Sequence, residues 1–131
     1  MANVLLDTTI AIDLLRARPA SVAWLRRLES AGDTPYVCAV TAEEVTVGLP
    51  PREREAATAL FEGLAAAPLA IAEGLLAGWW RHRFRSRGRT LSQGDCLIAA
   101  SAVSIGARLA TGNPKDFPMS DVEIEHVPAG R

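Results

Sequence analysis

Apolar and polar residues alternate along this chain in two rhythms, one typical of buried strands and one typical of amphipathic helices. Val4, Leu5 and Leu6 form a short apolar run that ends at a polar residue, as in a strand buried on both faces. Residues 10–16, in contrast, carry apolar side chains at helical spacing. The same alternation continues through the rest of the chain.

Turn and capping residues mark where each predicted element begins and ends. Ser21 is placed to cap a helix that stops at Gly32, and Thr41 with Glu44 forms a capping-box pattern. Strands are expected at residues 4–6, 36–40, 68–71, 108–111 and 122–127, and further helices at residues 10–16, 41–47, 52–66, 72–86 and 92–105.

Strands separated by helices indicate a mostly parallel sheet, here of four to five strands, with helices on both faces. A chain of 131 residues has the length of one compact domain. It contains no internal repeat, low-complexity tract or linker. The sequence therefore predicts an α/β protein with a three-layer α/β/α fold, formed by a single domain over residues 1–131.

Four acidic residues are expected at one end of this sheet. Asp7 ends the first strand, Glu44 and Asp95 lie in the first turns of two helices, and Asp116 follows the strand at residues 108–111. Ligand sites of open parallel sheets lie beyond the carboxyl ends of the strands. Each residue also has an ordinary explanation, as an N-cap, a capping-box glutamate, a helix-dipole partner or a turn residue. Those explanations do not require all four to lie together.

Clustered carboxylates repel one another and raise each other's pKa, so a fold that gathers them usually holds a cation. Oxygen ligands suit Mg²⁺ or Mn²⁺. Zinc is disfavoured because His82 and His126 are far apart in the sequence and neither Cys38 nor Cys96 has a CxxC partner. The chemistry implied is metal-assisted hydrolysis of a phosphodiester. The neighbouring acidic residues are expected to be solvated or to lie outside the ligand set: Asp13, Glu43 and Asp121.

The charge of the chain bears on which partners it attracts. The formal net charge is −1, so binding to nucleic acid requires a local basic patch. Residues 81–89 contain five arginines, of which Arg81 and Arg85 share a face if the segment is helical. We find no secretion signal and no apolar run of membrane-spanning length, and both cysteines have the surroundings of buried free thiols. A cytoplasmic protein is expected.

Four segments resemble those of VapC-type PIN domains, which are ribonuclease toxins of type II toxin–antitoxin systems. They read VLLDTT at residues 4–9, TAEEVTVG at residues 41–48, GDCLIAASA at residues 94–102 and LATGNPKDF at residues 109–117. The resemblance covers nearly the whole chain. It implies an Mg²⁺- or Mn²⁺-dependent endoribonuclease that cleaves cellular RNA, inhibits translation, forms a homodimer and is neutralised by a VapB-like antitoxin.

The same resemblance implies a set of site residues. Members of the family carry a glutamate four residues before a glycine, which Glu44 with Gly48 matches better than Glu43 does. Asn113 stands where many relatives have aspartate, so the fourth ligand remains open between Asn113 and Asp116. The implied catalytic and metal-binding residues are Asp7, Glu44, Asp95 and Asp116, and the candidate substrate contacts beside them are Thr8, Thr9, Thr111 and Asn113. Independently of the resemblance, Arg81 and Arg85 are candidate contacts for RNA phosphates because their segment precedes Asp95, with a solvated surface as the alternative.

Two other classes of function are weighed against a nuclease. A phosphotransfer protein with an aspartyl nucleophile is disfavoured, because the first strand ends in Asp-Thr-Thr and no lysine ends a later strand. The remaining alternative is a non-catalytic RNA-binding or interaction module whose acidic residues are structural. Metal-dependent RNA cleavage that disappears in Asp95→Asn discriminates between the two.

Overall fold

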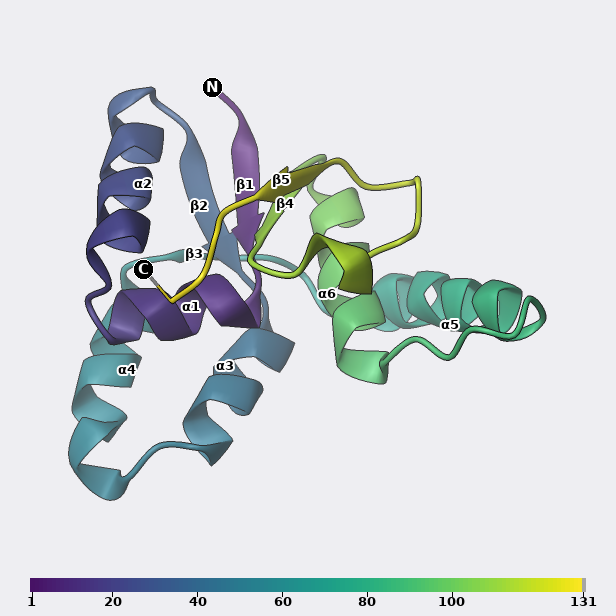
Figure 1. Cartoon of the computed structure of the whole chain (residues 1–131), viewed down its shortest axis with the longest axis horizontal. Coiled ribbons are helices and arrows are strands. Elements are labelled where there is room, and N and C mark those ends of the chain that lie inside the picture. The colour runs from purple at the N-terminus through teal and green to yellow at the C-terminus, as the bar shows by residue number, and fades with distance from the viewer. Residues whose placement is uncertain (131) are drawn as a thin grey trace.

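The computed structural model describes residues 1–130 and contains one parallel sheet with helices on both sides (Figure 1). The sheet has five strands in the order β3-β2-β1-β4-β5, and every neighbouring pair is parallel. The strands are β1 Asn3–Leu6, β2 Thr34–Val37, β3 Ala65–Ala66, β4 Arg108–Thr111 and β5 Ile124–His126. The helices are α1 Thr8–Leu15, α2 Pro19–Ser30, α3 Ala39–Val47, α4 Arg54–Glu62, α5 Ile71–Arg85 and α6 Gln93–Ser104, with short 3₁₀ turns η1 Pro51–Glu53 and η2 Pro114–Asp116. The predicted α/β/α fold is confirmed.

The alternating side chains of the central strands fill two separate hydrophobic cores. Leu5 of β1 packs into a core with α5 and α6, whereas Val4 and Leu6 pack with α1 and α2 on the other face. These strand residues are fully buried. Burial on both faces explains why the central strands read as continuous apolar runs.

Helices follow directly on the carboxyl ends of β1 and β2. The chain passes from β1 into α1 after a single residue, and from β2 into α3 after a single residue. Figure 1 shows α3 below the end of the sheet, between α1 and the amino-terminal end of α6. This end of the sheet is where the acidic residues were expected.

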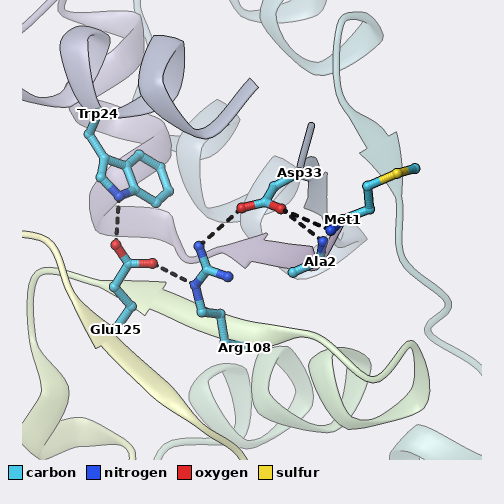
Figure 2. A network of polar contacts seen from close by, with 6 residues as sticks. All are labelled: Met1, Ala2, Trp24, Asp33, Arg108 and Glu125. Atoms are coloured by element: carbon cyan, nitrogen blue, oxygen red, sulfur yellow. Dashed lines mark hydrogen bonds and ion pairs between the residues drawn. The ribbon is translucent and has the colours of Figure 1, made fainter. Parts of the chain in front are cut away.

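A network of polar contacts joins the strands at the opposite end (Figure 2). The Glu125 carboxylate of β5 accepts hydrogen bonds from Trp24 Nε1 and Arg108 Nε, both at 2.7 Å. The Arg108 guanidinium lies 3.7 Å from the Asp33 carboxylate, which accepts a hydrogen bond of 2.8 Å from the backbone N–H of Ala2. These contacts connect α2 with the amino-terminal parts of β1, β2 and β4 and with β5.

Several predicted boundaries differ from the structure. The edge strand β3 lies at Ala65–Ala66 rather than at residues 68–71, and the helix predicted over residues 52–66 is divided into η1 and α4. The last strand is shorter than residues 122–127, and β2 begins and ends earlier than the predicted strand at residues 36–40. Ser21 is not the cap of α2, because Pro19 starts that helix after Arg18. Ser21 is buried instead, and its hydroxyl donates to Asp13.

None of the helices within residues 1–130 has the length and hydrophobicity that a bilayer-spanning helix needs.

Candidate metal and phosphodiester site

Asp7 is the most buried of the four predicted carboxylates, with 4% of its surface exposed. Its Oδ1 accepts hydrogen bonds from the Thr9 hydroxyl and from the backbone N–H of Ile10, and its Oδ2 accepts from the Thr111 hydroxyl. The N-cap explanation is therefore correct for Asp7. All of these donors are neutral.

Burial raises the pKa of Asp7, whereas the hydrogen bonds from Thr111, Thr9 and the backbone lower it. Burial is the largest of these effects, so the net pKa is above that of an exposed aspartate. The threonine hydroxyls also fix the orientation of the carboxylate. Asp7 is thus held in place by neutral groups, and its negative charge is not cancelled by them.

Glu44 does not belong to a capping box. Helix α3 begins at Ala39, directly after Cys38, which makes no side-chain cap. Thr41 is consequently inside the helix, and Glu44 lies beyond its first turn. The Thr8 hydroxyl donates to Glu44 Oε1, which ties α3 to α1. Thr8 and Glu44 therefore hold each other at the carboxyl end of the sheet.

Asp95 lies in the first turn of α6, as predicted. The Ser92 hydroxyl caps this helix by accepting a 3.0 Å hydrogen bond from the Asp95 backbone N–H. The preceding residue, Gly94, faces Glu44: a Cβ atom built on Gly94 would stand 2.7 Å from Glu44 Oε2. The absence of a side chain at Gly94 leaves space for that carboxylate, a role that the sequence pattern did not reveal.

The charges of the other three predicted carboxylates influence the pKa of Asp95. Burial raises this pKa most, a hydrogen bond with Ser92 lowers it, and the negative charges of Asp116, Glu44 and Asp7 raise it further. Three segments distant in the sequence therefore place negative charge near Asp95. We refer to Asp7, Glu44, Asp95 and Asp116 as the acidic cluster.

Within residues 1–130, no arginine or lysine forms an ion pair with this cluster. The ion pairs within residues 1–130 involve Asp33, Glu53, Asp121 and Glu125, and none includes a member of the acidic cluster. The repulsion between its carboxylates is therefore not relieved by a basic side chain in this part of the chain. A positive charge from outside the protein is the physical complement of such a site.

The remaining predicted residues divide into three groups. Thr8, Thr9 and Thr111 donate to the carboxylates of the acidic cluster. Asn113 is exposed, and its backbone N–H donates to the Thr111 hydroxyl at 2.9 Å. Arg81 and Arg85 are exposed on α5.

Of the neighbouring acidic residues, Glu43 and Asp121 are exposed, as expected. Asp13 is not solvated: it is buried and accepts hydrogen bonds from Ser21 and from the backbone N–H of Gly130. Its role is to connect α1 with α2 and with the C-terminal segment.

Whether the cluster fits a divalent ion depends on how many carboxylates the ion needs. Within residues 1–130, no three acidic, histidine or cysteine side chains form a ready-made metal cage. Mg²⁺ does not require one, because it keeps several waters and is usually bound by one or two carboxylates together with substrate phosphates. The accessible carboxylates of the cluster, exposed at Glu44 and half-buried at Asp95 and Asp116, fit this mode of binding.

Comparison with known proteins relates the chain to a protein family and to a ribonuclease. Residues 4–122 match the PIN domain family. Over 115 residues the chain is 33% identical to Ribonuclease VapC19 of Mycobacterium tuberculosis, and the match covers 88% of this chain and 92% of that protein.

Two similar solved structures come from VapBC complexes. The structure of VapBC2 from Rickettsia felis, bound to a DNA fragment from their promoter, has a TM-score of 0.83 at 18% identity and covers 95% of this chain and 98% of that chain. The structure of VapBC-1 from nontypeable Haemophilus influenzae has a TM-score of 0.79 at 26% identity and covers 95% and 97%.

We expect Asp95→Asn to stabilise the fold when divalent metal is absent. A carboxyl group whose pKa is raised on folding destabilises the folded state as pH rises from the group's unfolded pKa through its folded pKa, and this loss persists at neutral pH. The amide removes the charge. Because Asp95 is partly solvated, the gain in melting temperature at pH 7 in EDTA should be modest, roughly 1–3 °C.

Thermal melts at several pH values check this expectation. The difference between the variant and the parent should shrink as pH falls below the ordinary aspartate range, because both side chains are then neutral. A variant that is less stable than the parent at pH 7 in EDTA would contradict the account of repulsion at Asp95.

Proposed function

The chain belongs to the PIN-domain family, and from this we propose that it is a divalent-metal-dependent endoribonuclease that acts as the cytoplasmic toxin of a toxin–antitoxin pair. The proposal is supported by the acidic cluster: the charges of Asp116, Glu44 and Asp7 act on Asp95, and none of the four carboxylates forms an ion pair within residues 1–130. The likeness to Ribonuclease VapC19 supports RNA as the substrate.

We propose Asp7, Glu44, Asp95 and Asp116 as the residues that hold Mg²⁺ or Mn²⁺. When bound there, the ion supplies charge neutralisation for the phosphodiester and activation of the attacking water. The chain's own contribution is to fix the ligands. Asp7 is oriented by Thr9 and Thr111. Because Asp7 is buried, water solvates its negative charge poorly, and a bound cation would stabilise that charge.

In this proposal the fourth metal ligand, at the end of β4, is Asp116 and not Asn113. The threonines position the carboxylates. The charge of Asp116 acts on Asp95, whereas Asn113 is exposed and is linked to the site through its backbone N–H. Because each hydroxyl of Thr8, Thr9 and Thr111 donates to a carboxylate, these residues act on the reaction through the acidic cluster.

The decisive comparison is between two adjacent glutamates of α3. We expect Glu44→Gln to lower the rate of Mg²⁺-dependent RNA cleavage by about 10–100-fold or more, because the substitution removes one charge from the acidic cluster. Glu43→Gln is the matched control: both glutamates are exposed on the same helix, but it is Glu44 that accepts the Thr8 hydroxyl hydrogen bond and faces Gly94, so the change at Glu43 should leave the rate within about 2-fold of the parent. EDTA should abolish cleavage, and added Mg²⁺ or Mn²⁺ should restore it.

Equal rates for the two variants, or cleavage that persists in EDTA, would refute the proposed mechanism. A protein that binds RNA but does not cleave it under any metal condition would support the alternative, a non-catalytic RNA-binding module.

A VapB-like antitoxin is the proposed inhibitor, and the proposal rests on the similar VapBC complexes. The partner would neutralise the toxin by covering the acidic cluster at the carboxyl end of the sheet. Such a partner would need to present positive charge to this site, because no basic side chain of residues 1–130 pairs with the cluster.

A second copy of the chain is the proposed partner of α5. Ile71, Leu75 and Trp79 follow one another at intervals of four residues, and they are 79%, 61% and 69% exposed. A row of large apolar side chains in water is unfavourable and typically marks a protein contact surface. Gly74 and Gly78 lie along the same helix and leave its backbone open to close approach.

We expect Leu75→Glu to convert a dimer into a monomer, because it places a charge in the centre of this apolar row. Light scattering coupled to size-exclusion chromatography measures the mass directly. Val47→Glu, at an exposed apolar residue of α3, is the control and should leave the dimer intact. A parent protein that is monomeric at high concentration would overturn this assignment.

A further inference from the structure

The arginine-rich segment that follows Trp80 is fastened to the loop that carries Asp116. Arg83 pairs with Asp121 at 3.1 Å, and Arg89 donates to the backbone carbonyl of Lys115. Lys115 and Asp121 belong to the connection between β4 and β5, on either side of Asp116. Two of the five arginines therefore hold their segment beside one member of the acidic cluster.

The turn after α5 brings the later arginines back towards the helix end. Gly88 has a φ of +81°, a left-handed conformation that glycine adopts without strain. The backbone N–H of Gly88 donates to the carbonyl of Arg85, and that of Arg89 donates to the carbonyl of Phe84. This pattern closes the helix in a Schellman motif. The backbone from Arg81 to Arg89 is therefore held by hydrogen bonds, first of the helix and then of the turn that ends it.

The other three arginines are exposed, and within residues 1–130 they take part in no ion pair: Arg81, Arg85 and Arg87. We call them the arginine ridge. Arg81 and Arg85 lie one helical turn apart on α5, and Arg87 lies in the turn that follows. Like charges at this spacing repel one another, and an anion placed between them relieves the repulsion.

Helix α5, which carries Arg81 and Arg85, packs against α6. Glu73 near the start of α5 accepts a hydrogen bond from Ser104 at the end of α6, whereas Trp80 lies in the same core as Cys96 in the first turns of α6. The arginine-bearing end of α5 therefore lies nearer the first turn of α6 than its last, on the side where positive charge would meet a polyanion that enters the site.

A nuclease of net charge −1 whose site is acidic needs such a feature. The acidic cluster repels the phosphates that flank the cleaved bond, and the protein as a whole does not attract RNA. Guanidinium groups bind phosphate oxygens with two parallel hydrogen bonds.

We propose that the arginine ridge holds the phosphate backbone of single-stranded RNA alongside the acidic cluster, while Arg83 and Arg89 keep the ridge in position. This inference rests on the proposed ribonuclease function and names the surface that receives the substrate. Contacts with phosphates give affinity without base selection. The ridge should therefore affect how tightly RNA is bound and not which base is cut.

Binding is measured by fluorescence anisotropy with a labelled single-stranded RNA oligonucleotide, in the Asp95→Asn background so that RNA stays intact. The double substitution Arg85→Gln with Arg87→Gln should raise the Kd about 10-fold at moderate salt. It should also reduce the slope of log K against log salt concentration by about 1.4, since each phosphate contact on a single strand contributes about 0.7. The matched control is Arg26→Gln with Arg27→Gln on α2, which covers the other face of the sheet and should leave both quantities unchanged.

A salt slope that is equal in the ridge variant and its parent would overturn the proposal, and so would an equal loss of affinity in the α2 control. The first result would leave binding of an acidic protein partner as the explanation for the ridge. Cleavage in Mg²⁺ separates this outcome from failure of the proposed function. If the ridge binds RNA, the double variant Arg85→Gln with Arg87→Gln, made with Asp95 intact, should show a raised KM and an unchanged rate at saturating RNA. A parent that binds RNA through the ridge but never cleaves it would refute the nuclease and retain the ridge.

Discussion

Mutual repulsion between carboxylates at the carboxyl end of the sheet is the constraint on which the rest of this structure depends. The pKa of Asp95 is raised partly by the charges of Asp116, Glu44 and Asp7. A protein that only had to be stable would separate these groups or pair them with arginine or lysine. This fold instead supplies hydroxyl donors from Thr8, Thr9 and Thr111, which orient the carboxylates. Within residues 1–130 no basic side chain forms an ion pair with these carboxylates, so other parts of the fold must supply the stability that their repulsion removes.

That stability comes from the sheet and from its opposite end. The central strands are buried on both faces, and Leu5 and Leu6 of β1 are fully enclosed in the two cores. At the amino ends of the strands, the negative charges of Glu125 and Asp33 are matched by Arg108. The amino end of the sheet, where charges are paired, contributes to stability, whereas the carboxyl end holds the carboxylates proposed to bind a metal ion.

The sequence was sufficient for the fold class and for the placement of three of the four carboxylates relative to their elements. Asp7, Asp95 and Asp116 follow strong local signals: a buried apolar run, a serine N-cap and a short strand rich in apolar residues. Periodicity alone misplaced the start of α3, because Cys38 precedes that helix at the N-cap position without the side-chain hydrogen bond by which a sequence pattern identifies a helix start. Glu44 was therefore expected in a first turn, and its partnership with Thr8 was not foreseen.

Contacts between distant segments explain the other differences. Asp13 resembles a solvated helix residue until Ser21 and Gly130 are placed next to it. The five arginines of residues 81–89 are equivalent in the sequence. Only the fold distinguishes Arg83 and Arg89, which have partners in the β4–β5 connection, from the three that form no ion pair within residues 1–130. Local pattern thus predicts where a residue stands along its element, whereas long-range packing decides its partners.

The central claim is that the acidic cluster is a shared binding site for a divalent ion. Addition of Mn²⁺ to isotopically labelled protein tests it most directly, because this paramagnetic ion broadens the amide signals nearest its binding site. The account predicts that the signals of Thr8, Glu44 and Gly94 broaden first and recover when excess Mg²⁺ competes, while those around Asp33 and Glu125 at the other end of the sheet keep their intensity. Broadening that begins around Asp33 and Glu125, or that is uniform over the surface, would contradict it.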